Sequence, residues 1–207
     1  MLARATRPPP DGTPRAPAFE DLYQAIEALP QGITGEILEP GTIRAMGRPG
    51  SNHRHTARAL PRSLRRYDGE EGGCGWWFEV EAEIRLPNDR LVVPDLAGWR
   101  GEGVRPSFLR GNPIRVVPAW VCEILSPSTG PDDRRLKLPL YADQGTAWIW
   151  LADPEARTVE VFETREQMPV LVRQAKDADR VLLPPFDAEL DLAAWWPPAP
   201  AEESAAG

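Results

Sequence analysis

The chain has 207 residues, a net charge of -7 at neutral pH and a hydrophobic share of 42%, with eight Trp and 24 Pro. These values are typical of a globular protein with many turns, and all apolar runs are shorter than the roughly 18 residues that a membrane span needs. The negative charge disfavours nucleic-acid binding by the molecule as a whole, so any contact with phosphate requires a local basic patch.

One domain between two tails is expected. Residues 1–17 and 197–207 are rich in Pro, Ala and polar residues, a composition typical of disordered segments. Residues 18–196 suffice for one hydrophobic core, since a domain of about 170 residues buries around 70% of its unfolded surface. The amino terminus lacks the apolar centre of a secretion signal and the two cysteines lie far apart in sequence, so we expect a cytoplasmic protein with no membrane contact.

The first predicted elements are a helix and a hairpin. Residues 18–30 have apolar side chains at helical spacing and end at a proline, which predicts an amphipathic helix. Residues 35–46 predict a short hairpin that turns near Pro40 and Gly41.

A second helix is predicted from residue 51 to about 70, with Pro61 kinking or dividing it. Steps of four, four and three residues place several arginines along one side of this helix; these are Arg54, Arg58, Arg62 and Arg65. The stripe is a candidate nucleic-acid-binding surface, and a solvated helix face is the alternative. His53 and His55 point to different sides of a helix, which argues against a shared metal site.

Residues 75–100 predict a second hairpin around the turn sequence "PNDR". In its first strand, residues 76–86, every second side chain is apolar, so these side chains are expected on one face. Asp95 follows Pro94 in the second strand, within apolar surroundings. The pairing register stays open, so that either Glu81 or Glu83 could be its neighbour.

Residues 116–125 predict a central strand because they are apolar on both faces, apart from Glu123. Residues 132–143 predict a helix that ends at Gly145, with Asp133, Lys137 and Tyr141 at intervals of four on one face. Two strands flanking an Asp-Pro turn follow, and residues 169–174 predict one more. This order of helix, strands, helix and strands indicates a mixed α/β domain.

The carboxylates of Asp95 and Glu123 require a charge partner or a metal, because a buried acid is costly without one. Asp95 and Glu123 on neighbouring strands would suit Mg²⁺ or Mn²⁺, which prefer oxygen ligands. A lysine stem of roughly 6 Å would bring the Lys137 ammonium to that metal site if the helix folds back over the strand. Two acids, a metal and a lysine form a hydrolytic site. The alternative places both acids in turns, paired with arginine.

Three stretches resemble the Uma-two family of bacterial proteins, which is grouped with the PD-(D/E)XK, restriction-endonuclease-like nucleases. They are "GEILEPGTIRAMGRPGSNH", "VVPDLAGWR" and "VCEILSPSTGPDDRRLKLPLYADQGTAWIWLADPEARTVEVFE". The resemblance covers roughly residues 18–196 and implies a restriction-endonuclease-like mixed β-sheet core flanked by helices.

The resemblance also implies site residues. It implies a metal held by Asp95, Glu123 and a backbone carbonyl near Ile124, with Lys137 as the active-site lysine. Glu36, Glu83 and His53 fall at recurring family positions and are expected to support the site. One departure is that the superfamily's lysine usually lies two residues after the second acid, where this chain has Leu125.

The leading hypothesis is therefore a nuclease that hydrolyses phosphodiester bonds of DNA with Mg²⁺ or Mn²⁺, acting as a homodimer so that two sites cut both strands. A catalytically inactive nuclease-like fold, serving as a binding or assembly module, is the alternative. An acid-pair hydrolase of glycosidic bonds is a third reading, in which Lys137 has no role.

Overall fold

The computed structural model describes residues 17–127 and 130–198, so the predicted tails lie almost entirely outside the described residues. Its centre is a six-stranded sheet in the order β10-β9-β8-β7-β6-β3, in which only the β7–β8 pair is parallel. The strands are β3 (Trp76–Val80), β6 (Leu96–Arg100), β7 (Trp120–Ile124), β8 (Trp148–Asp153), β9 (Thr158–Arg165) and β10 (Met168–Lys176). The predicted mixed α/β fold is confirmed.

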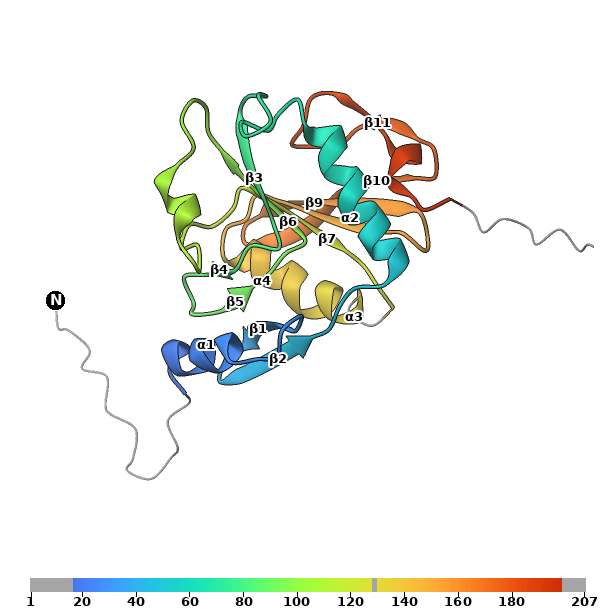
Figure 1. Ribbon diagram of the computed structural model, residues 1–207. Coiled ribbons are helices and arrows are strands. Elements are labelled where there is room, and N and C mark those ends of the chain that lie inside the picture. The colour runs from blue at the N-terminus through green and yellow to red at the C-terminus, as the bar shows by residue number, and fades with distance from the viewer. Residues whose placement is uncertain (1–16, 128–129, 199–207) are drawn as a thin grey trace, which may run out of the picture.

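A smaller sheet lies below the large one in Figure 1 and has the order β2-β1-β5-β4. It contains the first predicted hairpin, and helix α1 packs against it through a small apolar cluster. The elements of this part are α1 (Phe19–Glu27), β1 (Thr34–Glu39), β2 (Thr42–Met46), β4 (Ile84–Arg85) and β5 (Leu91–Val92). The helix and hairpin predicted for the first 46 residues are both confirmed.

Helices cover both faces of the large sheet (Figure 1). On one face α2 (Ser51–Leu64) packs together with the carboxy-terminal segment, which contains β11 (Arg180–Leu182), β12 (Glu189–Asp191) and η3 (Leu192–Trp195). On the other face lies a continuous helical segment formed by α3 (Gly130–Asp132), the π-helical turn η2 (Asp133–Lys137) and α4 (Leu138–Asp143). A short 3-10 helix, η1 (Ser107–Arg110), lies in the loop before β7.

Strand alternation assigns the side chains of β7 to the two faces. Trp120, Cys122 and Ile124 enter the core on the α2 side, and Val121 enters the core on the α4 side. Because alternate side chains of a strand point the same way, Glu123 also points to the α4 side. All five residues of this strand are buried, as predicted for the middle of a sheet.

Two predicted elements differ from the structure. The strand predicted for residues 76–86 breaks after Val80, because Glu81 has a φ of 51° and the chain leaves the large sheet there for the small one. The predicted apolar face fails at this point: Val80, which the alternation places on that face, is 58% exposed. The second helix is a single helix with Pro61 inside it, rather than two.

No helix within the described ranges is both long and apolar enough to cross a membrane.

Candidate active site

The register of the large sheet brings the two predicted acids together. Leu96 pairs with Cys122 and Ala97 with Val121 in the antiparallel β6–β7 ladder, so one further step places Asp95 opposite Glu123. The backbone N–H of Ile124 donates a hydrogen bond of 2.7 Å to Asp95 Oδ2.

A backbone hydrogen bond in the same region shows which glutamate is the neighbour of Asp95, a point that the sequence left open. The backbone N–H of Glu81 donates to the carbonyl oxygen of Asp95 at 3.2 Å. Glu81, the residue just after β3, is therefore the neighbour of Asp95, rather than Glu83.

Lys137 returns to the sheet and reaches the acid of β7. Its Nζ lies 3.3 Å from Glu123 Oε2, 2.9 Å from Glu36 Oε1 and 3.5 Å from Asp133 Oδ1. The π-helical turn that contains it is a feature found often at functional sites. The ammonium is thus near Glu123 although the residue two positions after this acid is a leucine.

Tyr141 and Glu36 fix the groups around this lysine. The hydroxyl of Tyr141 donates a 2.5 Å hydrogen bond to Glu123 Oε1, and the backbone N–H of Val93 donates one of 2.8 Å to Glu36 Oε1. Both side chains are fully buried. Their contacts give Glu123 and Lys137 one defined arrangement each.

The cluster holds more acids than bases, and the pKa values of Glu123, Glu36 and Lys137 are all raised. Burial raises the pKa of Glu123 well above its usual range, and the charges of Asp133, Asp95 and Glu36 raise it further, against the opposing effect of Lys137. Burial likewise raises the pKa of Glu36. Burial lowers the pKa of Lys137, but the charges of Glu123, Glu36 and Asp133 outweigh it and raise that pKa overall. The ammonium therefore stays charged.

His53 contacts the other acid. It lies in the first turn of α2, and its Nε2 is 2.9 Å from Asp95 Oδ1. Burial lowers the pKa of His53, but the hydrogen bond and charge of Asp95 raise it overall. Contrary to the alternative of arginine partners, the basic side chains that contact Asp95 and Glu123 in the described part of the chain are His53 and Lys137.

A cavity of about 570 Å³ opens onto these groups. Five of the residues predicted from the sequence line it, and Glu36 and Tyr141 lie behind them in contact with Lys137 and Glu123. The five are His53, Asp95, Glu123, Asp133 and Lys137. Side chains from β7, α2, η2 and the residue just before β6 thus converge on one volume.

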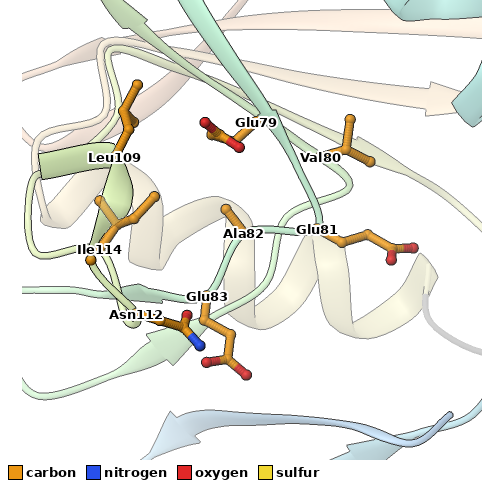
Figure 2. A pocket seen from close by; sticks show the side chains of 9 residues that line it. Glu79, Val80, Glu81, Ala82, Glu83, Leu109, Asn112 and Ile114 are labelled. Carbon is orange, nitrogen blue, oxygen red and sulfur yellow. The ribbon is translucent and has the colours of Figure 1, made fainter. Parts of the chain in front are cut away.

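Glu83 lies elsewhere. It lines a separate cavity of about 320 Å³ with Glu79 and Glu81, and its Oε2 accepts a 2.5 Å hydrogen bond from the hydroxyl of Tyr23. Figure 2 shows these three glutamates pointing in different directions, so they do not converge on a common point. The structure does not bring Glu83 to the acids of the large sheet.

The predicted arginine stripe also lies outside the cavity. All four of its arginines are exposed, three on α2 and Arg65 just after its end, and none of them lines the cavity. Arg54 donates a hydrogen bond to the carbonyl oxygen of Pro49, and Arg65 pairs with Glu71. Two other arginines, Arg44 and Arg48, do line the cavity. The sequence contained a signal for them, since both lie inside the stretch "GTIRAMGRPGSNH" that carries the family resemblance.

The donor set suits a hard divalent cation. Carboxylate oxygens are its preferred ligands, and Mg²⁺ keeps several waters and usually takes only one or two carboxylates from the protein. Asp95 and Glu123 supply that number at the cavity. In the described parts of the chain there is no group of three or more His, Cys, Asp or Glu side chains arranged to hold a metal. The carboxylates of Glu81 and Asp133 line the same cavity.

The sheet order, the helix that returns to it and the paired acids define a restriction-endonuclease-like α/β protein. The chain belongs to the Uma2 family, described as "Putative restriction endonuclease", whose model matches residues 19–194.

A crystal structure of a "putative nuclease belonging to DUF820" from Anabaena variabilis ATCC 29413 has the same fold. It is 20% identical, with a TM-score of 0.63 over 86% of this chain and 96% of that one. No curated protein matches the chain. The resemblance noted in the sequence and the predicted fold are thus confirmed.

Proposed function

We propose that this protein is a metal-dependent nuclease that hydrolyses phosphodiester bonds of DNA, using Mg²⁺ or Mn²⁺. The observation that carries the proposal is that Asp95, Glu123 and Lys137 face one cavity. The family description and the fold it shares with the Anabaena protein point to the same class of reaction. We also expect a homodimer, because one domain of this size spans little of a duplex.

In this proposal each residue of the cluster has one task. Asp95 and Glu123 hold the cation, with a backbone carbonyl near Ile124. The cation, when bound, polarises a phosphoryl oxygen and lowers the pKa of a bound water. Lys137 orients that water or stabilises the negative charge that develops on the phosphate.

Other residues of the cluster hold Asp95, Glu123 and Lys137 in position. Glu36 and Asp133 hold the Lys137 ammonium in place, and Tyr141 and His53 orient Glu123 and Asp95 through the hydrogen bonds described above. Because the side chain of Glu123 is only 3% exposed, the phosphate has to enter the cavity for the reaction to occur.

Cleavage of plasmid DNA tests the proposal. The wild-type protein is incubated with plasmid and Mg²⁺ or Mn²⁺, with and without a chelator, beside Glu123→Gln and the control Glu102→Gln. Glu102 is exposed in a loop and does not line the cavity. We expect cleavage that the chelator abolishes, that Glu123→Gln reduces by at least about 100-fold, and that Glu102→Gln leaves unchanged.

Equal cleavage by wild type and Glu123→Gln would place the activity outside this cluster. An absence of cleavage with either metal would contradict the enzymatic proposal and favour the alternative, a nuclease-like fold that serves as a binding or assembly module.

A further inference from the structure

One wall of the cavity consists of a segment to which the proposed mechanism gives no role. Residues 44–50 run from β2 to the start of α2 and line the cavity. They contribute two arginines, Arg44 and Arg48, beside the apolar side chains of Met46 and Pro49. This wall therefore combines positive charge with apolar surface, next to acids that face the same volume.

Arg48 differs from the other basic side chains at this cavity. Lys137 lies within reach of three carboxylates, His53 is bonded to Asp95, and Arg44 forms an ion pair with Asp132. Arg48 is exposed, and it makes no ion pair with any residue in the described ranges. Among the basic side chains that the described residues place at the cavity, Arg48 is thus the one whose charge remains for a ligand.

The guanidinium of Arg48 lies near the turn that contains Gly32. Gly32, in the turn between α1 and β1, has a φ of +84°, and a Cβ added there would lie 3.2 Å from Arg48 Nε. The planar guanidinium therefore lies close to this turn. A guanidinium can bind a phosphate through two parallel hydrogen bonds.

The end of a helix adds partial positive charge beside this segment. The segment leads into the amino-terminal end of α2, where Gly50 provides no side-chain cap and the first turn has no acidic residue. That end of a helix carries partial positive charge. In a protein whose net charge is -7, such local positive potential is what contact with a nucleic-acid backbone requires.

We propose that Arg48 binds a backbone phosphate of the nucleic acid next to the scissile one, and so positions the strand over Asp95 and Glu123. This inference rests on the proposed nuclease function. It assigns the phosphate contact to the segment before α2 rather than to the exposed stripe of arginines along that helix.

The test compares Arg48→Ala and Arg48→Lys with Arg62→Ala, all in the Glu123→Gln background, which prevents turnover. Arg62 is a matched control because it is also exposed and makes no ion pair among the described residues, but it does not line the cavity. Binding of a fluorescein-labelled single strand and of its duplex is measured by anisotropy over a series of salt concentrations.

We expect Arg48→Ala to raise Kd by about tenfold or more, because a hydrogen-bonded contact between charged groups is lost. The slope of log K against log salt should fall by about 0.9 for the duplex or 0.7 for the single strand. Arg48→Lys should keep most of the slope but lose part of the affinity, and Arg62→Ala should change neither.

Equal binding by Arg48→Ala and its parent overturns the inference, and so does an equal loss in Arg62→Ala. Both results leave the proposed function intact if the wild-type protein cleaves. Where the parent neither binds nor cleaves nucleic acid, the proposed function itself fails, and this inference fails with it.

Discussion

At the scale of single residues, the main feature is a lysine buried among carboxylates. The side chain of Lys137 is 4% exposed, and three acids lie within 3.5 Å of its Nζ. Burying a charge is costly unless it is paired, and removing one member of a buried ion pair leaves the other uncompensated. The three acids and the lysine are therefore mutually dependent.

Replacing Lys137 with methionine should lower the free energy of unfolding by about 3–5 kcal/mol at neutral pH. Methionine keeps the volume of the stem but leaves Glu36, Glu123 and Asp133 without their cation. Urea denaturation measures the effect, and Lys176→Met is the matched control because the only other lysine is exposed and lies outside the site.

The stability deficit of Lys137→Met should depend on pH. Lys137 lowers the pKa of Glu123 and of Glu36, so without it both values rise further above those of the unfolded chain. Between the carboxyl pKa values of the unfolded and the folded variant, the folded state binds more protons than the unfolded state, so the stability of the variant increases as pH falls. The deficit should therefore be smaller at pH 5 than at pH 8. A deficit that stays the same at pH 5 and pH 8 would show that charge is not its cause.

At the scale of elements, the small sheet and α1 position Glu36. This acid is on β1, beside Gly35, which faces α1. A Cβ on Gly35 would lie 2.7 Å and 2.8 Å from two carbons of Ile26 and 3.1 Å from Leu29. Gly35 thus allows α1 to pack closely on β1. The next residue of this strand, Glu36, contacts Lys137.

Gly35→Ala should lower the free energy of unfolding by about 1–3 kcal/mol, because the added methyl group overpacks the α1–β1 contact. The measurement is urea denaturation beside Gly47→Ala. A methyl group on Gly47 would meet nothing within 4 Å, so that control should be neutral or slightly stabilising. An equal loss in both variants would contradict the packing argument.

At the scale of the whole molecule, the carboxy-terminal segment completes the core on the α2 side of the large sheet. Phe186, between β11 and β12, is 3% exposed. Its ring lies 5.0–6.0 Å from five other aromatic rings, which belong to Tyr67, Trp76, Phe78, Trp120 and Trp150. These rings come from sequence positions up to 119 residues away. A single residue thus joins the segment to strands β3, β7 and β8.

Phe186→Ala should lower the free energy of unfolding by about 3–5 kcal/mol, since it leaves a cavity among aromatic rings that are held by the sheet. Thermal denaturation followed by Trp fluorescence measures the loss. Leu182→Ala, in the same segment but 54% exposed, should have little effect. A small loss in Phe186→Ala would mean that the segment is not part of the cooperative core.

The sequence alone determined most elements, because hydrophobic period and turn residues are local signals. It predicted the first helix and hairpin, the buried strand around Glu123 and the helix that carries Lys137. It also singled out Asp95 and Glu123, since an acid in an apolar strand is unusual wherever its partner lies. Lys137 was singled out because it shares one helix face with Asp133 and Tyr141. It missed the β11–β12 hairpin, and it missed the break after Val80, where the chain leaves the large sheet for the small one.

Only the tertiary structure decided which residues meet. The β6–β7 register places Asp95 opposite Glu123, and the helix that crosses the sheet returns Lys137 to the same acid. It also places Glu83 and the α2 arginines outside the cavity and Arg48 on its wall. Strand register and helix placement follow from side chains far apart in sequence packing together, so no local pattern in the chain could have contained them.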